Sequence, residues 1–303
     1  MNVHSGAQYG LLSLVPEVRR ARDFRLYTPK GRLIDLWQGG GAAVLGHTPP
    51  LVLRNFKNAA ERRLFTPLPH FFEGRFLKAL SLLFPGRIFR VYGPGTPLRM
   101  ILEAAGFGGS VVHDPAFGST GAAGDAGTAA APAGAVSLWR PFISPGAPLS
   151  VNKHVPVLIP VLPVMPAQYS VAQYSAEKRE AAWPCGLGVL ALDPEFEKDR
   201  VFPPSDVVAP VIFAAAVRGI YDLTAMADGR NAPFHRLQKG AWRRRGIYLV
   251  PDTQPGAARY AALFRRFLEG GFLLPPDPGF PLILPGVLSP GEEAALAKLL
   301  EFC

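Results

Sequence analysis

The chain has 303 residues, of which 49% are hydrophobic, so it holds enough apolar surface for a folded core and is not a disordered chain. Its 32 prolines are about twice the usual share, which favours short elements and long loops over a helical bundle. The net charge of +9 is concentrated in residues 1–100, which carry 15 basic and 5 acidic side chains.

This basic excess has two interpretations. Lysine and arginine clusters that face phosphates gain from counterion release, so polyanion binding is one hypothesis. The arginines are scattered, however, and only Arg243–Arg245 stand in a row. No nucleic-acid motif accompanies them. We therefore interpret the charge as a solvated surface and expect no nucleic-acid partner.

The sequence predicts a reducing, cytoplasmic setting. Cys185 and Cys303 are too few for a disulfide framework, and no cluster has the spacing of metal ligands. Residues 1–18 lack the basic start and apolar core of a signal peptide. The longest apolar stretch, Val155–Met165, contains three prolines and is too short to cross a bilayer, so no membrane partner is expected.

The first hundred residues predict a hairpin, two helices and a strand. Phe24–Tyr27 and Arg32–Trp37 flank a turn and read as the hairpin. Helical spacing of apolar residues predicts helices over Leu51–Leu64 and Phe71–Phe84. Ile88–Tyr92 then reads as a buried strand.

A glycine-rich turn follows that strand. Gly93–Pro97 leads into a short helix through Ala105, and a helix N-terminus after such a turn can hold a phosphate group. Similar turns occur in many proteins that bind no phosphate. Ser110–Asp114 is a further strand candidate. Residues 118–135 consist of Gly, Ala, Ser and Thr with one Asp and one Pro, a composition that indicates a flexible loop.

The rest of the chain alternates between strands and helices, which is typical of an α/β protein. Strands are predicted at Val136–Ile143, Val155–Val164, Gly186–Leu192, Gly246–Val250, Phe272–Leu274 and Leu282–Leu284. Ser205–Asp206 is predicted to cap a helix over Val211–Leu223. Further helices are predicted at Ala257–Glu269 and, after a capping box, at Ser289–Phe302.

Several motifs resemble those of class III aminotransferases, which are pyridoxal-phosphate transferases of fold type I. Tyr27–Leu36, Gly39–Gly41 and Val44–Pro50 resemble the N-terminal signature of that family. Gly95-Thr96 stands where the family has its Ser-Gly-Thr-Glu-Ala phosphate loop. Phe117–Thr120 resembles the aromatic-His-Gly motif whose ring stacks on the cofactor, and the likeness returns in the C-terminal tail.

The resemblance implies a fold and an assembly. It implies a PLP-transferase-like, fold type I large α/β domain with a mostly parallel sheet at residues 46–239. A small α+β domain would combine residues 1–45 with 240–303. It implies a homodimer, because the family builds its active sites at a dimer interface. It also implies that pyridoxal phosphate would bind at Gly95, Thr96 and Phe117.

The catalytic residues of the family are not identifiable. Its chemistry needs a lysine that forms a Schiff base and an acid, at a strand end, that keeps the pyridine nitrogen protonated. The best-matching strand, Leu158–Pro166, carries no acid. Lys153 is the candidate catalytic lysine, because Ser150 precedes it by three residues as in some relatives. Its place before that strand suits a surface lysine better.

We therefore interpret the chain as a shortened, divergent relative that is catalytically degenerate, a pseudoenzyme kept for binding or assembly. One alternative is an active aminotransferase with a relocated lysine, which would act on an amino acid or amine. The other alternative is a polyanion-binding protein that uses the basic N-terminal region.

Overall fold

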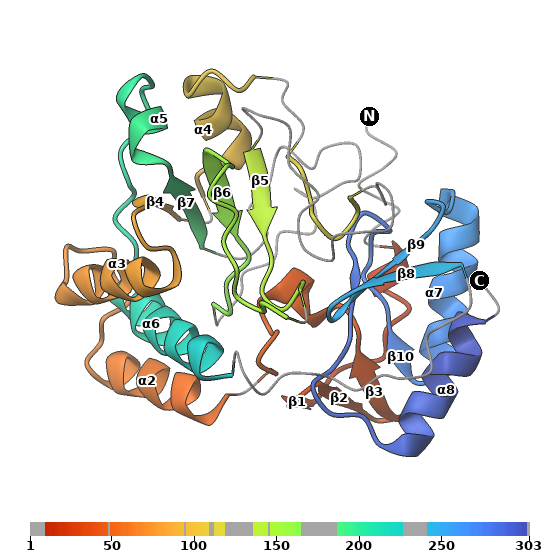
Figure 1. Cartoon of the computed structure of the whole chain (residues 1–303). Coiled ribbons are helices and arrows are strands. Elements are labelled where there is room, and N and C mark those ends of the chain that lie inside the picture. Colours follow the sequence, from red (N-terminus) through yellow and green to blue (C-terminus); the bar gives the residue numbers. More distant parts are fainter. Residues whose placement is uncertain are drawn as a thin grey trace.

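The structure is a computed structural model. It describes residues 10–47, 49–93, 95–108, 112–118, 136–144, 146–164, 187–226 and 241–301. Their helices and strands form two groups that lie side by side, one around a central sheet and one around two smaller sheets (Figure 1).

The central sheet is built from buried apolar strands. Its order is β4 (Ile88–Tyr92), β7 (Gly188–Leu192), β6 (Val157–Pro160) and β5 (Val136–Trp139). Three strands run the same way, and β7 runs against both of its neighbours. Every residue of β5, β6 and β7 is buried, which explains why they read as continuous apolar runs rather than as alternating patterns.

Helices cover this sheet from two ends. α6 (Pro210–Ala225) packs against both α2 (Pro50–Glu61) and α3 (Phe71–Leu83), and the three lie together in Figure 1. The short helices α4 (Leu98–Ala104) and α5 (Pro194–Lys198) lie at the other end. Small residues let α6 lie close to the segment that follows β6. At Gly219 of α6, the absence of a Cβ leaves room for the carbonyl of Pro163.

The second group joins the two ends of the chain. β10 (Phe272–Leu273) pairs in parallel with β3 (Gly31–Asp35), which continues through β2 (Arg25–Thr28) to β1 (Arg20–Arg22). A second, antiparallel sheet has the order β11 (Leu282–Ile283), β9 (Tyr248–Pro251) and β8 (Trp242–Arg245). The helices of this group are α7 (Ala257–Glu269) and α8 (Pro290–Leu300).

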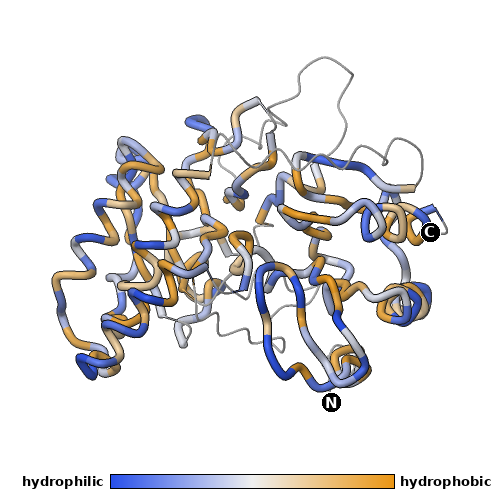
Figure 2. Tube along the Cα trace, turned by 90° about the horizontal axis from the view of Figure 1, so that it is seen from below, coloured by the Kyte–Doolittle hydropathy of each residue, from blue (hydrophilic) through white to orange (hydrophobic). Residues whose placement is uncertain are grey.

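One hydrophobic core runs through both groups. Leu36 and Phe264 belong to the same buried cluster as Leu158 and Phe213 of the central sheet and its helices. The helices carry hydrophilic stretches between hydrophobic ones, as Figure 2 shows along the trace. Because the core is continuous, the predicted division into residues 46–239 and 1–45 with 240–303 stays a prediction.

Several predicted elements are confirmed. β4 and α7 have the predicted bounds, and β2 and β3 form the expected hairpin. Ser289 accepts a hydrogen bond from the backbone of Glu292, whose side chain bonds the Ser289 backbone, so the predicted capping box is present. Among the described residues, no helix is long and apolar enough to cross a membrane.

Other predictions were wrong or concern residues outside the described ranges. The strand from Val136 ends at Trp139, because Phe142 has a φ of +61° in the turn that follows. Ser205–Asp206 does not cap α6, whose N-cap is Ala209 and has no side-chain bond. The loop at 119–135 lies outside the described residues, and so do positions 110 and 111 of the strand predicted before it.

Candidate functional site

The turn that follows β4 encloses a carboxylate of the protein itself. The backbone N–H of Gly93 donates to Oδ2 of Asp206 over 2.8 Å, and the Thr96 hydroxyl donates to the same oxygen over 2.5 Å. Asp206 lies in a segment that runs along the edge of β4. The backbone N–H of Asp206 donates to the carbonyl of Val91 there, over 2.8 Å. Asp206 therefore occupies the hydrogen-bond donors, Gly93 N–H and the Thr96 hydroxyl, that an anion bound at this turn would need.

This arrangement does not fit a phosphate group. A phosphate at the turn would meet the negative charge of Asp206 at hydrogen-bond distance, where like charges repel. The helix that follows, α4, has only seven residues and no side-chain cap. Gly95 is exposed, and a Cβ there would meet open space, so no close approach requires glycine.

A buried tyrosine stabilises the same turn. The Tyr92 hydroxyl donates to the carbonyl of Pro203 over 2.8 Å. Burial raises the pKa of Tyr92 to about 12; Arg90 lowers it, and the nearby Asp206 raises it further. Tyr92 therefore stays neutral at physiological pH and fixes the segment that carries Asp206.

A buried ion pair lies at the end of β5. Arg140 donates from Nε and Nη2 to the two carboxylate oxygens of Asp114, and each bond is 2.7 Å long. The side chains are 1% and 2% exposed. Arg140 Nη1 also lies 3.4 Å from the carbonyl of Gly40, and its guanidinium stands 5.3 Å from the Tyr248 ring centre. The pair thus joins the central sheet to the second group of elements.

Phe117 belongs to the loop Asp114–Gly118, whose backbone carbonyls accept hydrogen bonds from arginines of β8. Its N–H donates to the carbonyl of Asp114 over 3.0 Å, and its half-buried ring packs against the main core. Arg245 of β8 donates to the carbonyls of Pro115 and Gly118 over 2.9 and 2.8 Å. Burial lowers the pKa of Arg245, and the charge of Arg243 lowers it further.

The carboxyl ends of the co-directional strands β4, β5 and β6 lie at one edge of the central sheet. The residues that directly follow these strands are Gly93, Arg140 and Val161, and none of the three is an acid. Val161 packs so tightly on Gly41 that a Cβ at Gly41 would overlap it. Two acids bond residues of this edge: Asp206 accepts from Gly93, and Asp114 is paired with Arg140.

A second carboxylate accepts hydrogen bonds from the backbone at another turn, Gln38–Gly41. Asp35 accepts from the N–H groups of Trp37 and Gln38 over 2.8 and 2.9 Å, and its other oxygen lies 2.8 Å from Nε2 of His47. These bonds fix the turn Gln38–Gly41 (η1). His47 thus has the hydrogen-bonding role of a structural residue.

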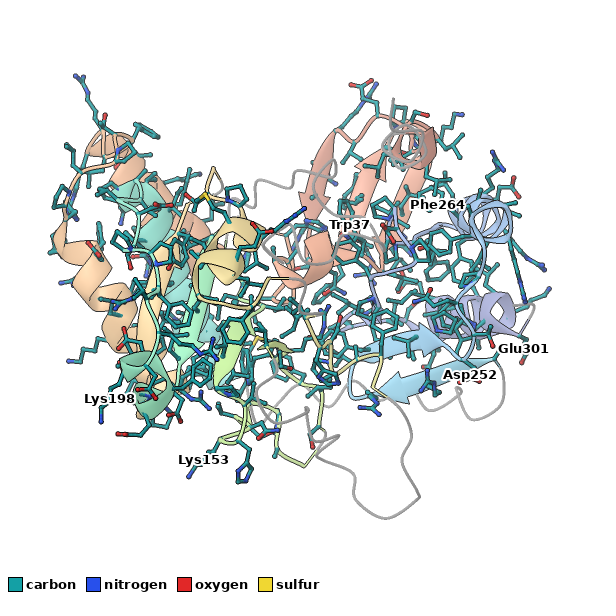
Figure 3. All side chains as sticks on the ribbon, turned by 90° about the horizontal axis from the view of Figure 1, so that it is seen from above. Trp37, Lys153, Lys198, Asp252, Phe264 and Glu301 are labelled. Atoms are coloured by element: carbon teal, nitrogen blue, oxygen red, sulfur yellow. The ribbon has the colours of Figure 1, made fainter. Side chains whose placement is uncertain are left out.

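The described lysines lie on the surface. Lys153 is exposed in the connection between β5 and β6, and its side chain points away from the sheet in Figure 3. The other described lysines are exposed too: Lys30, Lys57, Lys78, Lys198 and Lys298. Lys178 and Lys239 lie outside the described residues. Nor do the described residues contain a cluster of ligands that could hold a metal ion.

The predicted site residues are therefore not all brought together. Gly95 and Thr96 share the turn after β4, whereas Phe117 lies in the loop beside β5 and Lys153 faces solvent. Sequence reasoning missed both Asp206 and Arg140. A signal for Arg140 existed, because a lone arginine within the apolar run Val136–Phe142 needs a buried partner.

Comparison with known sequences identifies relatives but no function. No family model matches the chain. An uncharacterized protein of Treponema pallidum is 28% identical over 297 residues, which cover 88% of each chain. An uncharacterized protein of Borreliella burgdorferi is 35% identical over 75 residues, which cover 24% of this chain and 28% of that one.

Comparison with solved structures identifies the fold. Acetylornithine aminotransferase from Elizabethkingia anophelis matches with a TM-score of 0.58 and 13% identity, over 95% of this chain and 93% of that one. Ornithine aminotransferase from Plasmodium yoelii gives a TM-score of 0.60 at 11% identity over the same shares. A transaminase with PLP bound gives 0.55 at 17% identity, over 95% and 90%. The chain therefore has the aminotransferase fold, with its mixed central sheet and covering helices.

Proposed function

We propose that this protein keeps the aminotransferase fold without aminotransferase catalysis and serves in binding or assembly. The observation that carries the proposal is the carboxylate of Asp206, which occupies the donors of Gly93 and Thr96 where the resemblance would put a phosphate group. The exposed described lysines and the pairing of Asp114 with Arg140 support it. The assignment of Gly95, Thr96 and Phe117 to pyridoxal phosphate stays a prediction.

Titration with pyridoxal phosphate tests the proposal. We expect no Schiff-base absorbance and no adduct after borohydride reduction, in the wild type and in Lys153→Ala alike. An adduct on one lysine would overturn the proposal in favour of an active aminotransferase with a relocated lysine. Peptide mapping would then identify that lysine among the eight of the chain.

A second variant tests the role of Asp206 directly. Asp206→Ala removes the carboxylate that accepts from Gly93 and Thr96, and with it a negative charge, so we expect it to bind inorganic phosphate more tightly than the wild type does. Asp199→Ala, at an exposed aspartate after α5, is the matched control and should leave phosphate binding unchanged. Equal phosphate binding by the wild type and Asp206→Ala would show that Asp206 does not exclude the anion.

The basic N-terminal region is partly neutralised within the described residues, which favours a solvated surface over a polyanion site. Glu292 pairs with Arg25 and Arg32, and Arg90 and Arg99 each bond a glutamate. We expect no salt-dependent retention on heparin. Retention that falls steeply with salt would support the polyanion alternative.

We further propose that the protein is a homodimer, as the resemblance implies. The connection between α2 and α3, together with the first residue of α3, supports this proposal, since large apolar side chains face solvent there. Phe65 and Leu68 of the connection and Phe71 of α3 are 56%, 59% and 51% exposed. Such a cluster of exposed apolar residues is typical of a protein interface.

A further inference from the structure

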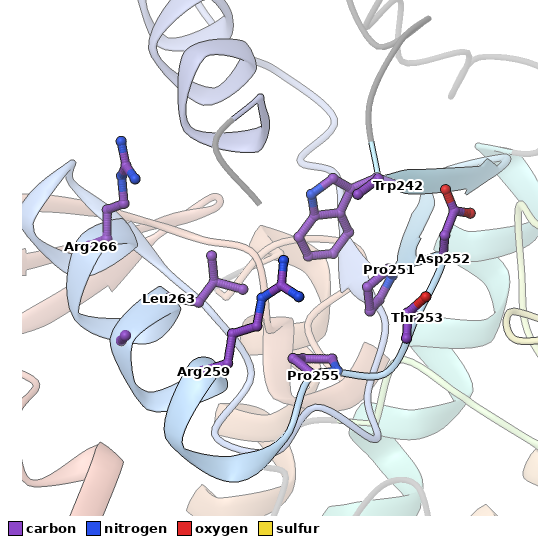
Figure 4. A pocket seen from close by; sticks show the side chains of 10 residues that line it. Trp242, Pro251, Asp252, Thr253, Pro255, Arg259, Leu263 and Arg266 are labelled. Carbon is purple, nitrogen blue, oxygen red and sulfur yellow. The ribbon is translucent and has the colours of Figure 1, made fainter.

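A pocket of about 280 Å³ lies between the β8–β9 hairpin and α7 (Figure 4). Residues that line it are Ala241, Trp242, Pro251, Asp252, Thr253, Pro255, Arg259, Ala262, Leu263 and Arg266. None of them belongs to the turns around Thr96 or Phe117, so this pocket is separate from the candidate site described above. Its volume is near the lower end of small-molecule sites, which fits a ligand of modest size.

An indole forms one wall of the pocket. Trp242 Nε1 is itself buried and has no hydrogen-bond partner among the described residues, so the ring and not the N–H faces the pocket. The Trp242 ring lies near Leu263 and Pro251 in Figure 4, so this side chain offers the pocket an apolar face. A ligand with an apolar body matches this face.

The pocket is also electropositive. Arg259 points toward Trp242 in Figure 4, is exposed, and forms no ion pair within the described part of the chain. α7 starts directly beyond Pro255 and Gly256, and it has neither a side-chain cap nor an acid in its first turn. The positive end of its dipole therefore adds to the charge of Arg259. Asp252, the acid among the lining residues, is paired with Arg243 over 3.0 Å.

We propose that this pocket binds a small organic carboxylate with an aromatic or aliphatic body. The carboxylate lies against the guanidinium of Arg259, and the body packs on the ring of Trp242 and on Leu263. This proposal goes beyond the proposed function and holds whether or not pyridoxal phosphate binds.

Calorimetric titration with simple probes tests the chemistry. Phenylacetate should bind saturably at millimolar concentration, and benzyl alcohol and acetate should each bind more weakly, because each lacks one half of the recognised structure. Phenyl phosphate distinguishes a preference for carboxylate from a preference for any aryl anion. The proposal is overturned if phenylacetate shows no saturable binding, or if acetate or phenyl phosphate binds more tightly.

Variants then place the binding in this pocket. Arg259→Ala should weaken phenylacetate binding about tenfold or more, because it removes a charged hydrogen-bond donor. Trp242→Phe keeps an aromatic ring on which the body can pack and should produce a smaller loss. Arg265→Ala, at an exposed arginine of α7 that does not line the pocket, is the matched control and should bind as the wild type does. Unchanged affinity in Arg259→Ala, with an unchanged circular dichroism spectrum, contradicts the proposal.

Discussion

Arg140 and Asp114 form two parallel hydrogen bonds of 2.7 Å, in a place where both side chains are almost wholly buried. Removing one partner of such a pair leaves a buried charge without compensation. We expect Arg140→Met to lower the free energy of unfolding by about 3–5 kcal/mol in urea denaturation. Arg99→Met breaks the exposed Arg99–Glu103 pair and should cost about 1 kcal/mol or less. Similar losses in both variants would contradict the structural role of the buried pair.

Asp206 should stabilise the fold as well as close the turn after β4. Its carboxylate accepts from Gly93 and Thr96, so Asp206→Ala removes both of these hydrogen bonds. We expect a loss of about 1–3 kcal/mol in thermal or urea unfolding. Asp206→Asn keeps an acceptor oxygen and should lose less. An Asp206→Ala protein as stable as the wild type would show that these bonds contribute little.

Alanine substitutions at two glycines with similar φ angles distinguish the cost of backbone strain from the cost of steric overlap. Gly41 has a φ of +121° and lies against Val161, whereas Gly31 has a φ of +126° and faces open space. Both Gly→Ala variants meet backbone strain, but only Gly41→Ala adds a steric overlap. We expect Gly41→Ala to be about 1–3 kcal/mol less stable than Gly31→Ala by chemical denaturation. Adding Val161→Ala should recover part of the difference, and no recovery would argue against the contact.

Glu292 should make the protein sensitive to acid. Burial alone would raise the pKa of Glu292, but hydrogen bonds from Arg25 and Ser289 outweigh it and lower the pKa below its ordinary value of 4.5. The resulting stabilisation is complete above pH of about 4.5 and disappears as the pH falls through the folded pKa. We expect the stability difference between the wild type and Glu292→Gln to shrink over that range. The control Glu301→Gln, at an exposed position, should show a constant difference.

The exposed apolar cluster between α2 and α3 should control the oligomeric state. Sedimentation equilibrium should show a dimer for the wild type and a shift toward monomer for Leu68→Asp, because a charge would enter the interface. Val287→Asp changes another exposed apolar residue, 66% exposed, and should leave the dimer intact. A monomeric wild type would refute the predicted homodimer.

The sequence predicted the fold well where local pattern and tertiary packing agree. The apolar run of β4 and the capping box before α8 each predicted the observed element, and the helix predicted at Ala257–Glu269 is α7. The resemblance to class III aminotransferases predicted the overall fold, which the solved aminotransferases share.

Prediction failed where long-range contacts override local pattern. Ser205–Asp206 has the composition of an N-cap, but both residues bond the edge of β4 instead, 114 and 113 positions away from their partners. The strand β8 escaped notice because three of its four residues are arginines. Two of those arginines bond carbonyls of the loop Asp114–Gly118, a contact that no local pattern contains.

The parallel pairing of β3 with β10 has a consequence for synthesis of the protein. The hairpin Arg25–Asp35 emerges from the ribosome long before its neighbouring strand, Phe272–Leu273. Glu292, which bonds Arg25, emerges later still. The N-terminal sheet therefore has an open edge until Phe272 and Leu273 have been translated, and a ribosome that stalls before residue 272 releases a chain with that edge unpaired.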